Sequence, residues 1–434
     1  MNIPKQELEQ RIQKIKNIVH NNYPSLQGFF IFSRINIYYF TGTLAHGVLY
    51  IPLSGEPFLF VRKGLERAKE ECPFTQIFAY KSYAEIEKIC ADCKAPLTET
   101  AAYGMENTGL TEQLAALFKI KIKALTQNEP IGIDNEIKQV QSIKSTYECK
   151  KMREAGKRQA LALEQILPFY LQKMLDGEFP NSPSLLEQYN KELLASYPQD
   201  TSLSEINIAK LCIRIYTELG HAFMTRMSAH GEEACFGHVA CGNNLNQAHY
   251  YNGAMGFQGL HPAMPCLGSE KIWQKGEPLC VDMLFNFEGY CTDKTQTCFY
   301  GSRKDLPDIA KKAYECCCTV QELVLNQLKA GTIPQEIWFN TLKIVDKFNF
   351  TENFMGYKSN SVPFLGHGIG LTVDQFPVIA KGFQDPLENS MFIACEPKIG
   401  IPGFGMIGIE NTFELIDNTV KNITSIQDGI IFLN

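Results

Sequence analysis

One apolar run near the middle of the chain carries a charge. Residues 279–285 read Leu-Cys-Val-Asp-Met-Leu-Phe, a pattern typical of a buried strand, with Asp282 at its centre. A buried carboxylate without a partner costs on the order of several kcal/mol. The chain can therefore bury this strand only if a positive group meets Asp282.

A second acid follows at hairpin spacing. The turn signal Asn286-Phe-Glu-Gly289 leads into an alternating stretch that carries Asp293, 11 residues after Asp282. A hairpin turning near residue 288 places the two acids almost opposite each other, and carboxylates that close repel unless a cation lies between them. The alternative is a solvated Asp293 and a core Asp282 that pairs with a lysine. The hairpin alone leaves both interpretations open.

Three further donors favour the metal interpretation. His367 lies among the glycines of Gly366–Gly370, which predicts an irregular segment that presents the ring as a ligand. Glu396 ends the apolar run 391–395, and Glu410 lies in an alternating stretch with its side chain on the face opposite its neighbours. Four acids and one histidine on strands suit a pair of divalent ions such as Mn²⁺, Co²⁺, Fe²⁺ or Zn²⁺. Dispersal of these five groups, or their burial against lysines without room for cations, would contradict that hypothesis.

The order of predicted elements gives the architecture. Strand signals and helical runs interleave over the first third, which predicts an α/β domain over residues 1–140. A long helical stretch from about residue 146 opens the second part, and strands and glycines dominate from residue 237 onward. Residues 141–434 are therefore expected to form an α+β domain.

Composition excludes several classes of protein. The 434 residues hold 41 basic and 47 acidic side chains, with no basic run to follow a phosphate backbone, so nucleic acid is not an expected partner. No run approaches the roughly 18 apolar residues of a membrane span, and no targeting segment is expected at the start. The 15 cysteines show no framework of paired spacings, which predicts reduced thiols, no structural disulfides and a cytoplasmic location.

These segments resemble a known family. Their order and spacing are similar to the five metal ligands of the pita-bread metallopeptidases, which include aminopeptidase P, prolidase and methionine aminopeptidase. The stretch Ser33–Gly42 resembles the creatinase-type first domain of aminopeptidase P and prolidase. The segments that carry the catalytic-domain resemblance are Val281–Thr295, Gly366–Leu371, Cys395–Pro397 and Ile409–Thr412.

The resemblance implies a creatinase-like first domain, a pita-bread catalytic domain and a homodimer that removes the N-terminal residue from peptides, above all when proline follows. It implies that two divalent ions, with Mn²⁺ the first choice, share a water that ionises and attacks. Glu396 is then the proton acceptor that passes the proton to the leaving amine. The implied ligands are His367 for one ion, Asp282 for the other, and Asp293, Glu396 and Glu410 shared between the two.

The sequence departs from the family pattern near the substrate. Peptidases of this group usually carry His-Glu seven residues after the ligand histidine, where this chain has Asp374 and Gln375, and two usual arginines are replaced by Gln296 and Gly408. A substrate histidine is expected upstream of Asp282. His261 is the nearest candidate, and His249 or His238 are the alternatives.

Two other functions stay open at this stage. The dimethylsulfoniopropionate lyases resemble the same fold, and Asp374 beside the metals could remove a carbon-bound proton. A binding-only role is the third possibility, against which the retention of all five ligand types argues.

Overall fold

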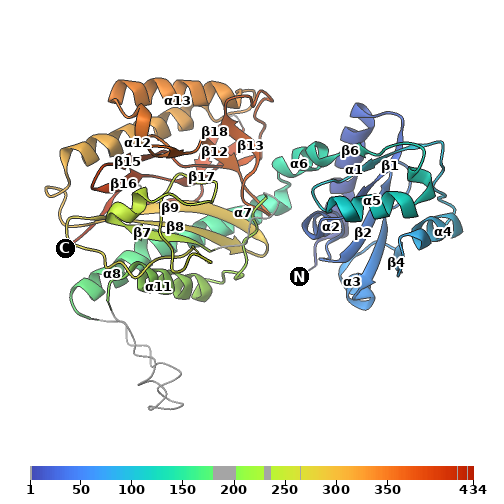
Figure 1. Cartoon of the computed structure of the whole chain (residues 1–434), viewed down its shortest axis with the longest axis horizontal. Helices are drawn as coiled ribbons and strands as arrows, with labels where there is room; N and C mark the ends of the chain where they lie inside the picture. The colour runs from blue at the N-terminus through green and yellow to red at the C-terminus, as the bar shows by residue number, and fades with distance from the viewer. Residues whose placement is uncertain (1, 179–201, 229–235, 264, 418, 428) are drawn as a thin grey trace, which may run out of the picture. The chain divides into compact units, whose positions relative to one another are not determined.

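The structure, a computed structural model, describes residues 2–178, 202–228, 236–263, 265–417, 419–427 and 429–434 (Figure 1). Contacts within the chain separate it into two units, Met1–Gln141 and Ser142–Asn434. The boundary predicted near residue 140 falls inside helix α6 (Asp134–Ser142). No helix in the described ranges is long and apolar enough to cross a bilayer.

The first unit is built on one mixed six-stranded sheet with the order β4-β3-β2-β1-β5-β6. Aromatic side chains pack on one face of it, where Phe30 contacts Tyr50 and Phe118 at ring-centroid distances of 4.8 and 5.1 Å. Its strands are β1 (Leu26–Ile31), β2 (His46–Pro52), β3 (Phe58–Lys63), β4 (Ile77–Ala79), β5 (Ala102–Met105) and β6 (Ile131–Gly132). Its helices before α6 are α1 (Lys5–Asn22), α2 (Arg34–Thr41), α3 (Leu65–Glu71), α4 (Ala84–Asp92) and α5 (Glu112–Lys121).

Helices of the second unit form two layers with the strands between them (Figure 1). The long helix expected from residue 146 begins at a capping box made by Ser145 and Glu148, since each side chain satisfies the other's backbone N–H. It continues through a π-helical turn, Leu161–Ile166, into the next helix. The helices are α7 (Thr146–Ala160), α8 (Leu167–Leu175), α11 (Glu205–Glu218), α12 (Asp308–Gln327) and α13 (Pro334–Phe348).

Two larger sheets and two short ribbons fill the space between the helical layers. A four-stranded sheet has the order β19-β9-β8-β7 and a five-stranded sheet the order β13-β12-β14-β17-β18. Strands β15 and β16 pair only with each other, as do β10 and β11. The strands are β7 (Gly237–Cys241), β8 (Pro278–Phe287), β9 (Tyr290–Tyr300), β10 (Gly356–Tyr357), β11 (Asn360–Ser361), β12 (Phe364–Gly368), β13 (Gln375–Ala380), β14 (Phe392–Cys395), β15 (Lys398–Ile401), β16 (Gly405–Gly408), β17 (Asn411–Ile416), β18 (Thr419–Asn422) and β19 (Ile431–Leu433).

Each helical layer buries its apolar face against one group of strands. Residues of α7, α8 and α11 pack with β7, β8 and β9 in one core cluster, and α12 and α13 pack with β12, β14 and β15 in another. No disulfide joins cysteines of the described ranges. The predicted α+β architecture is confirmed, and the apolar run around Asp282 is the buried strand β8.

Candidate metal centre

The hairpin of β8 and β9 places two carboxylates on one face. Asp282 pairs with Thr295 and Leu284 pairs with Asp293, so the two acids are diagonal neighbours offset by two residues. The sequence prediction put them almost opposite each other. The offset arises because the last pair before the turn is Phe287 with Tyr290. Asp282 and Asp293 would pair directly only if the turn came one residue earlier in the chain.

His367 comes from the regular strand β12, between β13 and β14, and the irregular segment predicted from its glycines is wrong. Instead, the glycines allow the neighbouring strands to pack closely against β12. A Cβ on Gly366 would lie 2.2 Å from Ala394 O, and one on Gly368 would lie 2.1 Å from Phe376 O. His367 Nδ1 donates to Gly368 O at 3.1 Å, which leaves Nε2 as the ring nitrogen that faces the carboxylates.

Glu396 and Glu410 lie where one antiparallel ribbon changes sheets. Cys395 pairs with Asn411 in the five-stranded sheet, and Lys398 pairs with Gly408 in the β15–β16 ribbon. The same register places Glu396 opposite Glu410 in the gap between the two ladders. Two glutamates far apart in sequence are thus held side by side by backbone pairing.

The structure brings all five expected donors together. Ligand atoms of Asp293, His367 and Glu410 lie within 4.8 Å of one another, and so do ligand atoms of Asp282, Glu396 and Glu410. The buried Asp293 Oδ1 has no hydrogen-bond partner within the described part of the chain. Burial, and then the charges of Glu410, Asp282 and Glu396, raise the pKa of Asp293 well above its ordinary value. A buried carboxylate oxygen that has no partner among the described residues, beside an imidazole nitrogen that faces carboxylates, fits divalent metal binding.

Lys398 is the residue that the sequence analysis missed. Its Nζ lies 2.6 Å from Glu396 Oε2, 2.8 Å from Glu410 Oε2 and 3.3 Å from Asp282 Oδ2, and its side chain is 1% exposed. Burial alone lowers the pKa of Lys398, but the three carboxylates raise it well above its ordinary value, so it carries a charge. Asp282 therefore has the lysine partner of the alternative interpretation. The signal was present, because residues two apart share a face of a strand and Lys398 follows Glu396 by two.

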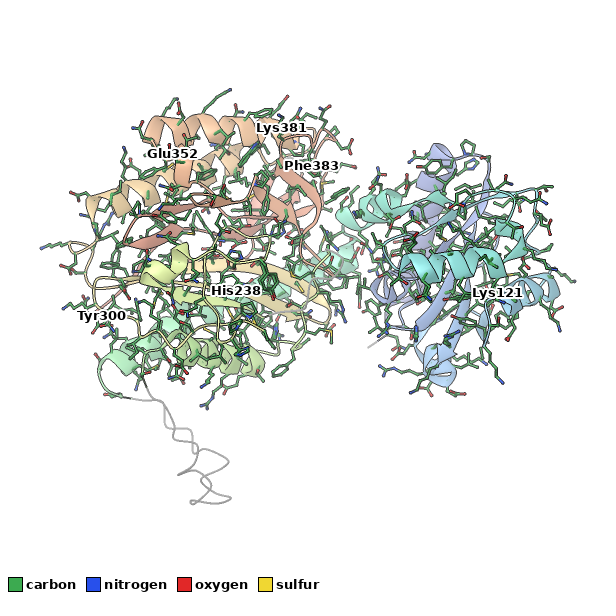
Figure 2. The ribbon with its side chains drawn as sticks, viewed as in Figure 1. Lys121, His238, Tyr300, Glu352, Lys381 and Phe383 are labelled. Atoms are coloured by element: carbon green, nitrogen blue, oxygen red, sulfur yellow. The ribbon has the colours of Figure 1, made fainter. Side chains whose placement is uncertain are left out.

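A cavity of about 70 Å³ opens beside these groups. His238 and His249 both line it, and both rings stack on Phe257, at centroid distances of 3.6 and 4.3 Å (His238 is labelled in Figure 2). Asp374 lines it as well, with Oδ1 3.5 Å from His367 Nε2.

His261 is not brought to the cluster. It is exposed, its Nδ1 accepts the backbone N–H of Ala263, and it is absent from the described lining of the cavity. Proximity in sequence to Asp282 was the wrong criterion, since β7 places His238 directly across from Asp282.

The two glutamines that depart from the family pattern also lie outside the described lining. Gln296 Nε2 donates to the carbonyls of Thr297 and Gly429, and Gln375 Oε1 accepts from Lys144 Nζ. Both side chains are buried and form hydrogen bonds within the protein. They therefore do not take the place of charged groups facing the cavity.

Comparison with known proteins agrees with this geometry. The model of metallopeptidase family M24 matches residues 150–417, and that of the creatinase/prolidase N-terminal domain matches residues 11–143. The Xaa-Pro dipeptidase of Pyrococcus furiosus is 23% identical over 426 residues, which covers 98% of this chain and 100% of the relative.

Solved structures share the fold. The Xaa-Pro dipeptidase from Bacillus anthracis superposes with a TM-score of 0.73 at 21% identity, covering 98% of this chain and 100% of that one. The N-terminal domain of the FACT complex subunit SPT16 from chickpea superposes with a TM-score of 0.69 at 11% identity, covering 98% of each chain. The fold thus occurs in proteins of differently named roles, whereas the family model matches well over half of the sequence. The chain belongs to metallopeptidase family M24, with a creatinase/prolidase N-terminal domain preceding the M24 domain.

Proposed function

We propose that the protein is a metal-dependent peptidase that removes the N-terminal residue from peptides in which proline follows. The observation that carries this proposal is the group Asp293, His367 and Glu410, which faces a cavity and holds a buried carboxylate oxygen without a partner. The similarity to a Xaa-Pro dipeptidase along nearly the whole chain supports the choice of substrate.

The residues of the cluster have separate roles in binding the metal and in transferring the proton. Asp293, His367 and Glu410 would hold a divalent ion, with Glu396 beside them. Such an ion lowers the pKa of a bound water from about 15.7 to about 7 and polarises a carbonyl group. Glu396, which lines the cavity, accepts the proton of the attacking water and passes it to the leaving amine.

Two side chains are assigned to the substrate. His249 replaces His261 as the histidine that faces the peptide, because it lines the cavity and is fixed by stacking on Phe257. Burial lowers the pKa of His249 to about 4, so the ring is neutral and can donate one hydrogen bond to a carbonyl or oxyanion. Asp374, which also lines the cavity, is the second.

Mn²⁺ is the first ion to test, followed by Co²⁺, Zn²⁺ and Fe²⁺, because carboxylate oxygens dominate the donor set. A homodimer and a cytoplasmic location remain our expectations from the family resemblance and the unpaired cysteines. Light scattering on the eluting protein tests the first, and fractionation of the source cells tests the second.

The test of function uses protein stripped with a chelator and reloaded with Mn²⁺. We expect cleavage of Xaa-Pro dipeptides or short Xaa-Pro peptides, little cleavage of matched Xaa-Ala peptides, and loss of activity on chelation. Asp293→Asn and His367→Ala should be inactive. The proposal is overturned if protein of verified metal content leaves a broad panel of short peptides intact.

A binding role without metal is the second candidate, because Lys398 already neutralises part of the acidic cluster. Metal analysis separates the two, since a binding module of this kind retains no ion after dialysis against Mn²⁺. No observation on the described residues, and none of the comparisons, favours the lyase alternative.

A further inference from the structure

Lys398 occupies the middle of one of the two groups that could hold an ion. Its Nζ is within 3.3 Å of an oxygen from each of Asp282, Glu396 and Glu410, the three residues of that group. A metal ion binds carboxylate oxygens at about 2.0–2.2 Å. An ammonium group and a metal ion that need the same three oxygens exclude each other by volume and by like charge.

The backbone holds Lys398 in this place. On β15, Lys398 is two residues from Glu396 and on the same face, and its cross-strand partner is Gly408 on β16. A Cβ on Gly408 would lie 2.5 Å from Lys398 Cγ, so the missing side chain at 408 is the space through which the lysine stem passes. The side chain is 1% exposed within the described structure, so the ammonium group is buried.

The group of Asp293, His367 and Glu410 still has an acidic oxygen that a cation could bind. Asp293 Oδ1 is buried and has no partner among the residues that the structure describes, and His367 Nε2 lies 4.0 Å from Asp293 Oδ2 and 3.5 Å from Asp374 Oδ1. Lys398 has no ion pair with Asp293 or Asp374 among those found in the described ranges. Lys398 thus pairs with Asp282, Glu396 and one oxygen of Glu410, whereas Asp293 Oδ1 keeps no partner among the described residues.

We propose that the ammonium group of Lys398 replaces one metal ion, so that each chain binds a single divalent ion at Asp293, His367 and Glu410. This inference rests on the proposed function only in that the cluster binds a metal. It changes the expected chemistry, because the attacking water is then activated by one ion and lies beside a fixed ammonium group instead of a second ion.

The experiment measures Mn²⁺ bound per chain after equilibrium dialysis, together with the electron paramagnetic resonance spectrum, on the full-length protein. We expect one Mn²⁺ and the signal of an isolated ion in the wild type and in Lys398→Arg, which keeps the positive charge. Lys398→Ala should bind two Mn²⁺ per chain and show a spin-coupled spectrum. Lys271→Ala is the matched control, since Lys271 also pairs with a glutamate, at 2.6 Å, but outside the cluster.

Two Mn²⁺ per wild-type chain, or none, would overturn the inference. The wild-type result does not depend on whether Lys398→Ala folds. One Mn²⁺ in a protein that cleaves no peptide supports this inference and contradicts the proposed function, whereas two Mn²⁺ in an active enzyme does the reverse.

Discussion

Asp374 Oδ1 lies 3.5 Å from His367 Nε2, the ring nitrogen that faces the acidic cluster. Asp374 adopts a left-handed backbone conformation, with φ at 59°, directly before strand β13 begins at Gln375. A carboxylate therefore stands beside the one imidazole nitrogen available to a metal ion. It adds negative charge to the side of the cluster that Lys398 does not neutralise.

Replacing Asp374 with Asn should weaken Mn²⁺ binding about tenfold or more, the usual effect of losing a group that supports a metal ligand. Isothermal titration calorimetry on the stripped protein measures this affinity. The exposed Asp385→Asn removes the same charge elsewhere and should leave the affinity unchanged. Equal affinity of Asp374→Asn and wild type would show that Asp374 does not act on the ion.

His249→Ala should lower kcat/KM for a Xaa-Pro peptide by about 10²–10³, the range for loss of a single oxyanion donor. His261→Ala should leave kcat/KM at the wild-type value, because His261 is exposed and outside the described cavity lining. Steady-state kinetics on both variants, at equal metal content, makes the comparison. The reverse ranking would return the substrate role to His261.

The contrast between these histidines shows how far sequence reasoning reaches. The five donors could be found because a carboxylate in an apolar strand, such as Asp282, is unusual wherever the strand lies. The cavity wall could not be found, because it depends on β7 lying across from β8 and on Phe257 stacking between two rings. The spacing of Lys398 from Glu396 was a usable signal, but only the pairing with Gly408 shows that the lysine stem has room to enter the buried cluster.

Removing the metal should destabilise the second unit. An ion that binds only the folded state adds about 2.7 kcal/mol at 100 times its dissociation constant. Calorimetry should therefore show a lower Tm for the wild type in excess chelator than in Mn²⁺. In Asp293→Asn the two values should coincide, because the negative charge of the buried carboxylate is gone. If the Tm of the wild type is the same in chelator and in Mn²⁺, metal does not bind at this group.

His221 should make the stability of the second unit sensitive to acid. The buried ring accepts the N–H of Asn286 at 2.8 Å through Nδ1, and burial lowers its pKa from 6.5 to about 4. Between these values the unfolded chain binds a proton that the folded chain does not, so stability falls as pH falls. The full difference is about 3 kcal/mol.

Denaturant unfolding between about pH 4 and pH 7 tests this expectation. His221→Phe suits the surrounding rings of Tyr216, Phe236 and Phe285, and its unfolding free energy should vary less with pH than that of the wild type. The exposed His20→Asn should keep the wild-type dependence. If the unfolding free energies of His221→Phe and wild type vary with pH in the same way, another group is responsible for the loss of stability in acid.

Gly408→Ala tests whether the lysine stem needs the space on β16. The added Cβ would lie 2.5 Å from Lys398 Cγ and 2.8 Å from Pro397 O, so either the stem or the strand must move. We expect a loss of about 1–3 kcal/mol in unfolding free energy, as for overpacked sites. Gly253→Ala is the control, because nothing lies within 4 Å of its added Cβ.

A double-mutant cycle with Lys398→Ala separates the two contacts. In the Lys398→Ala background the Cγ is absent, so the cost of Gly408→Ala should fall but not vanish, since the contact with Pro397 O remains. A cost that is the same in both backgrounds would mean that the lysine stem does not depend on Gly408. The ammonium group would then be held by the three carboxylates alone, and a strongly bound second ion could compete with it for those oxygens.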